Sequence, residues 1–260
     1  MGIISYAQNF EDVILWRALS KIKNGFYIDV GAQDPQVDSV SRAFYENGWK
    51  GVHIEATTEY ANKIRNDRPD ELVIEAALSD LTGSMTFYQI PGTGLSTGDT
   101  EVAMKHKEMG LKLTELTVNT VTLDEIFLQI KANEVHWLKI DVEGMEKKVI
   151  DGWRDNSFRP WVLVIESTYP NTQVETHEKW EQLLLDKGYD FVYFDGLSRF
   201  YLHKEQSDLA HHFRNPPNVF DKFLIAKNSH FSIICNNEIQ EKMKEIAKLK
   251  ATIENYENKP

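Results

Sequence analysis

A short apolar run at residues 26–30, Phe-Tyr-Ile-Asp-Val, most limits what this chain can fold into. It stops at Gly31, which is typical of a buried strand that ends in a turn. Asp29 lies within the run, where an unpaired carboxylate would be costly. In open α/β sheets ligands bind beyond the strand ends, and Gly31 lets the backbone approach a ligand closely. The run therefore predicts the ligand turn of an α/β sheet; the alternative is an ordinary strand-to-loop junction.

A second predicted strand, residues 49–56, also ends in an acidic residue, Glu55, which suits a ribose diol. A third, residues 72–78, has an end that is small and polar, Glu75-Ala-Ala-Leu-Ser-Asp80, as expected where an adenine ring lies against backbone. The dinucleotide fingerprint G-x-G-x-x-G is absent, because Gln33 and Gln36 stand where its second and third glycines would be. The sequence therefore gives little support to pyrophosphate binding.

Charged residues also interrupt a predicted strand at residues 137–142, which carries Lys139 and Asp141 and is followed by Glu143. A further strand, residues 161–166, ends in Glu166. Charges at the end of a central strand are costly unless they are paired or used. This part of the chain is therefore the predicted reaction centre.

The composition excludes several classes of protein. The chain has 260 residues, enough for one sizeable α/β domain with an appendage, and its net charge of −11 disfavours binding to nucleic acid. It has no long apolar run and no signal-peptide pattern, so neither export nor a membrane span is expected. The single cysteine, Cys235, excludes an internal disulfide framework and a multi-cysteine zinc site. These features predict a cytoplasmic protein.

Residues 91–116 begin with a glycine-rich segment that contains Ser96 and continue into a basic patch around His106. The segment lacks periodicity, so we expect either a lid that faces the substrate or a disordered connection. Ser96 and His106 are candidate substrate contacts, although a lone histidine on a mobile segment is more often solvated. Asp34 and Asp38, after the first strand, are expected to line the entrance of the site.

Helices and a hairpin are predicted around these strands. A helix within residues 5–20, with Asn9 as its cap, either packs on the sheet or lies across the open end of the pocket. Thr122 and Glu125 form a capping box. A helix is expected at residues 177–187, and two apolar runs at 189–202 predict a β-hairpin.

The last part of the chain has a different composition, rich in Glu, Lys, Ile and Ala. We divide the chain into a domain at residues 1–231 and a helical tail at 232–260. Apolar residues recur in the tail every three or four positions, at Ile239, Met243, Ile246, Leu249, Ile253 and Tyr256. Such a seam is consistent with a coiled coil and a homo-oligomer, or with docking on its own domain. A chain that is part of a longer polypeptide is also consistent with this ending.

Several blocks of the sequence together resemble the FkbM-type methyltransferases, which use S-adenosylmethionine (SAM). The blocks are Ser5-Tyr-Ala-Gln-Asn-Phe-Glu-Asp-Val-Ile-Leu, Phe26-Tyr-Ile-Asp-Val-Gly-Ala, Gly48-Trp-Lys-Gly-Val-His-Ile-Glu-Ala, Ala77-Leu-Ser-Asp, Thr122-Leu-Asp and Leu138-Lys-Ile-Asp-Val-Glu-Gly-Met-Glu. The resemblance spans most of residues 5–202 and excludes the tail. It departs from the family pattern at Gln33-Asp34-Pro35, on the rim of the methionine pocket.

This resemblance implies a class I methyltransferase: a Rossmann-like α/β sheet of seven mostly parallel strands with a terminal antiparallel hairpin and SAM at the strand ends. The residues expected to bind SAM are Asp29, Gly31, Ala32, Asp34, Glu55, Ala56, Ala77, Leu78 and Asp141. The implied reaction is O-methylation of a hydroxyl on a sugar or glycan intermediate, as in surface polysaccharide biosynthesis. Asp38, Ser96 and His106 are expected to contact this acceptor.

A sugar hydroxyl is a weak acid, so a base or a metal must assist its reaction. Asp141 is the expected base or positions the acceptor, with Glu143 and Glu166 nearby. Nothing in the spacing of these carboxylates demands a divalent metal, and no metal ligands are assigned. Two other hypotheses remain: a non-catalytic oligomerisation module of a larger polysaccharide-assembly protein, and a nicotinamide-dependent sugar enzyme.

Overall fold

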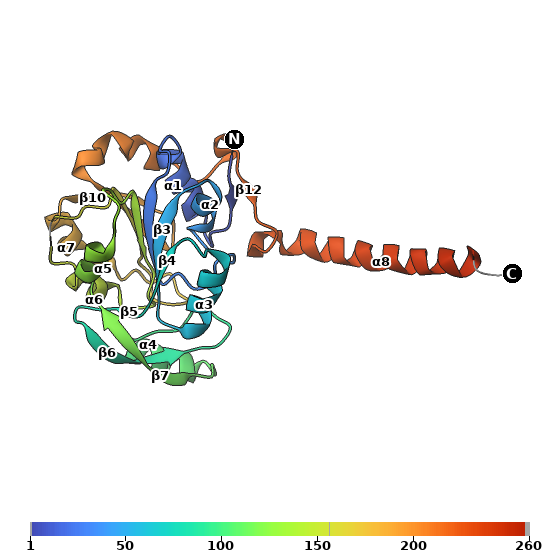
Figure 1. The fold of residues 1–260 in the computed structure, drawn as a ribbon, viewed down its shortest axis with the longest axis horizontal. Coiled ribbons are helices and arrows are strands. Elements are labelled where there is room, and N and C mark those ends of the chain that lie inside the picture. Colours follow the sequence, from blue (N-terminus) through green and yellow to red (C-terminus); the bar gives the residue numbers. More distant parts are fainter. Residues whose placement is uncertain (1, 156, 258–260) are drawn as a thin grey trace.

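A seven-stranded sheet forms the centre of the computed structural model, in the order β10-β11-β9-β8-β2-β3-β4 (Figure 1). The model describes residues 2–155 and 157–257; the side chains of residues 233–235 and 251–257 are outside this description. The parallel strands are β2 (Phe26–Val30), β3 (Lys50–Glu55), β4 (Leu72–Glu75), β8 (Trp137–Ile140) and β9 (Val162–Glu166). The hairpin β10 (Tyr189–Phe194) and β11 (Ser198–His203) completes the sheet, with β11 antiparallel to both neighbours. The predicted fold class is confirmed.

Helices cover both faces of this sheet. One layer contains α1 (Glu11–Leu19), α2 (Arg42–Glu46) and the 3-10 segment η2 (Lys204–Phe213). The other contains α5 (Leu123–Gln129), α6 (Glu146–Asp151) and α7 (Glu181–Asp186). Alternate side chains of β2 point to the two layers, so Tyr27 and Ile28 belong to different apolar cores. Helix α3 (Thr58–Asp67) packs along β3 and β4.

A smaller sheet, in the order β5-β7-β6, lies below the main sheet in Figure 1. Its strands are β5 (Ala77–Leu78), β6 (Gly83–Gln89) and β7 (Thr114–Val121). The single strand predicted at residues 72–78 is therefore wrong: β4 pairs with β3, whereas β5 pairs with β7. The chain changes sheet at Ala76, whose N–H donates to the carbonyl of Glu55 (3.1 Å).

Helix α4 (Thr100–Glu108) stands where the sequence predicted a lid or a disordered connection. Asp99 caps it by accepting from the N–H groups of Glu101 and Val102, which satisfies two donors of the first turn. Most of its residues are polar and it buries only a short stripe of side chains, so its periodicity is weak. The alternative of a disordered connection is wrong for these nine residues, whereas a lid that faces the substrate remains a prediction.

Two details of the predicted helices are also corrected. Asn9 does not cap α1: Phe10 occupies the N-cap position at φ 65°, and the Asn9 side chain donates to the carbonyl of Asp195. Of the two positions expected for this helix, on the sheet or across the open end of the pocket, α1 takes the first, because its apolar side chains belong to one of the two cores. The helix predicted at residues 177–187 is divided into η1 (His177–Lys179) and α7 at Trp180, whose side chain is buried. The capping box of Thr122 and Glu125 and the hairpin are confirmed.

The two ends of the domain meet in a small parallel sheet of β1 (Ile4–Ser5) and β12 (Leu224–Ile225). Strand β12 follows the 3-10 segment η3 (Val219–Asp221), and η4 (His230–Ser232) then leads into α8 (Ile233–Glu257). Helix α8 projects away from the body of the molecule (Figure 1). Among the described helices, none is long and apolar enough to cross a bilayer.

The seam of α8 is open to solvent in the described part of the chain. Ile239, Met243, Ile246 and Leu249 are each more than half exposed. The side chains of Ile253 and Tyr256, and residues 258–260, lie outside the described residues. Pairing with a second copy, and the division of the chain at residue 232, remain predictions.

Candidate cofactor and acceptor site

A cavity of about 930 Å³ lies at the carboxyl ends of β2, β3, β8 and β9. This volume is in the range of small-molecule sites, roughly 300–1,000 Å³. Gly31 and Asp141 meet at its floor, because β2 and β8 are neighbours. Gly31 has φ +73°, and a Cβ atom there would lie 1.8 Å from the Asp141 carbonyl oxygen. A glycine is therefore required at this strand end.

Glu55 is held in place on one side of the cavity. Its carboxylate accepts from the N–H (2.8 Å) and the hydroxyl (2.7 Å) of Thr57, and from the N–H of Gln33 (3.0 Å). Burial raises the pKa of Glu55, and these hydrogen bonds partly oppose that effect. Each carboxylate oxygen has more than one lone-pair site, so Glu55 can accept further hydrogen bonds from a ligand. Gln33 reaches it from a left-handed backbone conformation, at φ 47°.

Apolar side chains continue the cavity beyond Glu55. The lining residues there are Ile54, Ala56, Tyr60, Ala76, Ala77, Leu78 and Phe87. Gly31 and Ala32 line the cavity on the side of β2. A carboxylate beside an apolar slot matches a ribose attached to a flat aromatic base. The predicted cofactor residues Gly31, Ala32, Glu55, Ala56, Ala77, Leu78 and Asp141 thus all line one cavity.

Asp29 does not line the cavity, contrary to the expectation from the sequence. It is 1% exposed and accepts a hydrogen bond from the Ser41 hydroxyl at 2.6 Å. The reason is the strand alternation: Asp29 shares the face of Tyr27, and the residues on either side of it point to the opposite core. Asp34 is also absent from the lining. It accepts from the N–H groups of Gln36 and Val37, which shapes the turn after β2.

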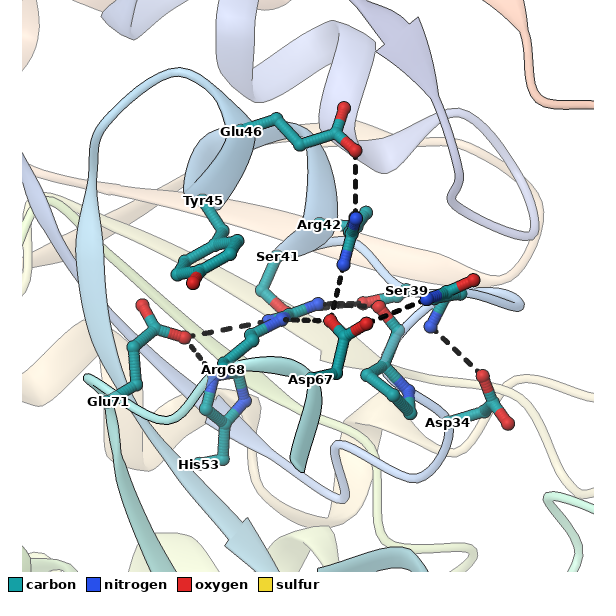
Figure 2. A network of polar contacts seen from close by, with 12 residues as sticks. Asp34, Ser39, Ser41, Arg42, Tyr45, Glu46, His53, Asp67, Arg68 and Glu71 are labelled. Carbon is teal, nitrogen blue, oxygen red and sulfur yellow. Dashed lines mark hydrogen bonds and ion pairs between the residues drawn. The ribbon is translucent and has the colours of Figure 1, made fainter. Parts of the chain in front are cut away.

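Behind Asp29, the fully buried Arg68 organises a polar network (Figure 2). Its guanidinium donates to the Ser41 hydroxyl (2.8 Å), to the Ser39 hydroxyl (3.0 Å) and to the carbonyl of Pro35 (2.7 Å). Glu71 lies 3.8 Å from the same guanidinium and 2.8 Å from His53 Nε2. Arg68 therefore ties the turn after β2 to the neighbouring strand β3, and it reaches Asp29 through Ser41.

Lys139 is a site residue that was not assigned a role from the sequence. Its Nζ lines the cavity region and donates to Asp141 Oδ2 at 2.8 Å. Burial alone would lower the pKa of Lys139, but the charges of Asp141 and Asp29 raise it above its ordinary value. Lys139 is thus a fixed cation beside Asp141. A lysine within a buried strand was the signal that could have identified it.

Three carboxylates, Asp141, Glu143 and Glu166, meet at the polar end of the cavity. One oxygen from each lies within 4.8 Å of the others. Burial and the neighbouring acidic charges raise the pKa of both Glu143 and Glu166 well above the usual value. The three predicted catalytic residues are therefore brought together, although they come from two strand ends.

The loop after β8 positions Glu143 towards the cavity. Glu143 has φ 52° and Gly144 has φ 98°, so the chain turns sharply here. The Thr97 hydroxyl donates to the Glu143 carbonyl (2.7 Å), and Glu146 Oε1 accepts from the N–H groups of Val142 (3.3 Å) and Gly144 (3.1 Å). Burial raises the pKa of Glu146 to about 7, with backbone hydrogen bonds opposing this. Glu146 thus holds the backbone of this loop in place through its two hydrogen bonds.

The rim of the cavity includes Asp38 and Ser96, two of the three predicted acceptor contacts. The third, His106, is not part of the lining; it is 2% exposed within α4, and burial lowers its pKa. It is therefore not the solvated histidine of a mobile segment. The rim also includes polar residues that the sequence did not identify: Gln8, Thr93, Thr168, Asn171, Thr172, Gln173 and His230.

The fold and this site define a class I SAM-dependent methyltransferase, with a mostly parallel sheet, a terminal hairpin and an apolar slot beside Glu55. The chain belongs to the FkbM family, because the family model of the methyltransferase FkbM domain matches residues 29–191. Residues around Glu55 would hold the adenosine part of SAM, and their donors and apolar lining fit it. SAM supplies an electrophilic methyl group when bound.

Three solved structures illustrate the similarity. A methyltransferase FkbM from Methylobacillus flagellatus is 14% identical over 70% of this chain and 44% of that chain, with a TM-score of 0.42. A TehB-like SAM-dependent methyltransferase from Corynebacterium glutamicum is 7% identical over 74% and 87%, with a TM-score of 0.42. An O-methyltransferase from Bacillus cereus in complex with SAH is 10% identical over 74% and 79%, with a TM-score of 0.38.

This chain therefore spans less than half of the length of that FkbM structure. No curated protein matches the chain. The assignment to the family rests on the domain match and not on these structural likenesses.

Proposed function

We propose that this methyltransferase transfers the methyl group of SAM to a hydroxyl of a sugar or glycan intermediate. The observation that carries this proposal is a contrast within the lining of the cavity. The lining beside Glu55 is apolar, whereas the rest of the lining carries three clustered carboxylates and several uncharged polar residues. Those residues are Thr93, Ser96, Thr168, Asn171, Thr172 and Gln173. Hydroxyl and amide side chains exchange hydrogen bonds with a polyhydroxyl acceptor on several sides.

In this proposal Asp141 accepts the proton of the acceptor hydroxyl or orients that hydroxyl towards the cofactor. Its position suits the role because it lines the cavity and is held in place by a hydrogen bond from Lys139 Nζ, 2.8 Å away. Glu143 and Glu166 stand beside it to receive further acceptor hydroxyls. The contribution expected of a positioned base is a factor of about 10² to 10⁴ in rate.

The biological setting is the second part of the proposal. A glycan acceptor places the enzyme in surface polysaccharide biosynthesis in the cytoplasm, either alone or as part of a longer polypeptide. The domain match that covers residues 29–191, and the projecting helix α8, are consistent with a methyltransferase unit attached to other parts.

The test combines a binding assay with a turnover assay. Calorimetry should show that the whole chain binds S-adenosylhomocysteine and not NAD, and that Glu55→Gln weakens this binding. Transfer of radiolabelled methyl groups from SAM to a panel of sugars and nucleotide sugars should yield a methyl ether. Asp141→Asn should lower turnover about 10² to 10⁴-fold while S-adenosylhomocysteine binding is kept.

Asp186→Asn, an exposed carboxylate of α7 that accepts from Gln182, is the matched control and should behave as the wild type. Binding of S-adenosylhomocysteine without methylation of any sugar in the panel would refute the acceptor class. Unchanged turnover in Asp141→Asn would remove this residue from the reaction.

A further inference from the structure

We propose that Asp141, Glu143 and Glu166 bind one divalent cation of the magnesium or manganese class at the polar end of the cavity. The three residues line the same cavity, and one oxygen of each lies within 4.8 Å of the other two. Two oxygens on opposite sides of one cation are about 4.2 Å apart around Mg²⁺ and about 4.8 Å apart around Ca²⁺. Oxygens on adjacent positions around Mg²⁺ are closer, about 3 Å apart, so a single ion can contact all three carboxylates once the side chains draw in around it.

Buried oxygens without a hydrogen-bond partner, on two of these three residues, are the second observation. Oε2 of Glu166 and Oε2 of Glu143 are buried and have no hydrogen-bond partner among the described residues. Glu166 is only 9% exposed, and both side chains line the cavity. A buried carboxylate oxygen without a partner is costly. A ligand that enters from the cavity is the way to satisfy both.

Two other buried carboxylates that line or support the cavity, Glu55 and Glu146, differ in this respect. The Glu55 carboxylate accepts hydrogen bonds from Thr57 and Gln33, and Glu146 Oε1 accepts from two backbone N–H groups of its own loop. The chain thus supplies donors to these two groups. It leaves Oε2 of Glu143 and of Glu166 for something that the cavity admits.

The charges of the cluster favour a cation over other occupants. Three carboxylates face one ammonium, that of Lys139, which donates to Asp141 Oδ2. When a cation displaces the protons of Glu143 and Glu166, the two negative charges left after pairing with Lys139 equal the charge of one divalent ion. A proton shared between two of the carboxyl groups would join that pair and leave the third carboxyl group without a partner. All the donor atoms are carboxylate oxygens, which suit Mg²⁺, Mn²⁺ or Ca²⁺ better than Zn²⁺.

A cation bound here would keep coordination positions open towards the cavity, because all its protein ligands come from the ends of β8 and β9. Hydroxyl oxygens of the acceptor can fill these positions, which would place the reacting hydroxyl at a fixed point. This role rests on the proposed function, whereas the cation site itself does not.

The test is direct titration of Mn²⁺ into the whole chain after dialysis against a chelator. Electron paramagnetic resonance follows the loss of the free Mn²⁺ signal as the ion binds. Addition of Mg²⁺ then shows whether Mg²⁺ displaces the bound Mn²⁺ from the same site. We expect one bound ion per chain and at least a tenfold weaker affinity in Glu166→Gln and in Glu143→Gln. Asp151→Asn, an exposed carboxylate of α6 that pairs with Lys147, should bind as the wild type does.

Absence of a stoichiometric ion in the wild type would overturn the inference, as would equal affinity in the wild type and in the Glu143→Gln, Glu166→Gln double variant. A thermal melt of each variant checks that it is folded. The assay needs neither SAM nor an acceptor, so its outcome is separate from the acceptor class. Sugar methylation in the presence of chelator would sustain the proposed function and reject the role of the cation in placing the acceptor. Ion binding without sugar methylation would sustain the cation site and reject the acceptor class.

Discussion

The ammonium of Lys139 lies 2.8 Å from Oδ2 of Asp141, and both residues stand at the carboxyl end of β8. Lys139 also faces Asp29 across the parallel pair β2 and β8, where the two residues are in register. The ammonium thus lies between a carboxylate of the core and a carboxylate of the cavity. This relationship links the buried network of Figure 2 to the proposed reaction centre.

Lys139→Met should lower turnover about 10² to 10³-fold, because Asp141 then stands beside two other acids without a cation. The shape of the pH–rate profile should change, since the ammonium next to the proposed base is removed. A simple packing role would leave the shape of this profile unchanged. Lys147→Met, which removes an exposed partner of Asp151, is the control and should retain the wild-type profile.

Arg68→Met should lower the free energy of unfolding by about 3 to 5 kcal/mol, because it leaves buried partners without their cation. The affected groups are Glu71, the Ser39 and Ser41 hydroxyls and the Pro35 carbonyl. Urea unfolding of the whole chain measures the change. Arg65→Met, in the last turn of the helix that ends just before Arg68, changes a side chain that is 39% exposed and should cost less than about 1 kcal/mol. Equal losses in the two variants would refute the structural role given to Arg68.

Local patterns were sufficient to predict most of the main sheet. Apolar runs that end in Gly31, Glu55 or Glu166 gave three of its strands, and the hairpin followed from two runs around a turn. Helix α4 was missed because it buries few side chains and depends on packing against the rest of the fold. The change of sheet at Ala76 was missed because β4 and β5 are nearly continuous in sequence and differ only in their partners.

The site was predictable where one strand end supplies one side chain, as for Glu55, Asp141 and Glu166. It was not predictable where the direction of a side chain decides whether the residue lines the cavity. Asp29 looks like a ligand residue in sequence, but it accepts a hydrogen bond from Ser41, which in turn contacts Arg68. Arg68 lies 39 residues after Asp29 in the chain. Such long-range pairs leave no spacing pattern in a single sequence.

Stability should fall as pH rises from about 5 to about 8, and Glu11 should cause part of this fall. Burial and the charge of Asp195 raise the pKa of Glu11 from 4.5 to about 8. The unfolded chain loses this proton at lower pH than the folded chain, so the stabilisation is complete below pH 4.5 and is lost as pH approaches 8. The loss is at most about 1.4 kcal/mol per pH unit.

Glu11→Gln removes this titration and should flatten the dependence of stability on pH. Urea unfolding at several pH values measures the slope. Glu178→Gln, in the exposed segment η1, is the control and should keep the wild-type slope. A wild-type slope in Glu11→Gln would show that another group is responsible.

Gly31→Ala should be far more damaging than Gly48→Ala, although both glycines have left-handed backbone conformations, at φ +73° and +84°. At Gly48 a Cβ atom would meet nothing within 4 Å, so the cost is the conformational term alone, about 1 to 2 kcal/mol. At Gly31 the Cβ atom would lie 1.8 Å from the carbonyl oxygen of Asp141, so β2 and β8 must separate. The added cost of such a clash raises the total to about 2 to 5 kcal/mol. Urea unfolding gives both values, and S-adenosylhomocysteine binding should be lost in Gly31→Ala and kept in Gly48→Ala. If Gly31→Ala and Gly48→Ala changed S-adenosylhomocysteine binding equally, the contact between the ends of β2 and β8 would not shape the cofactor site.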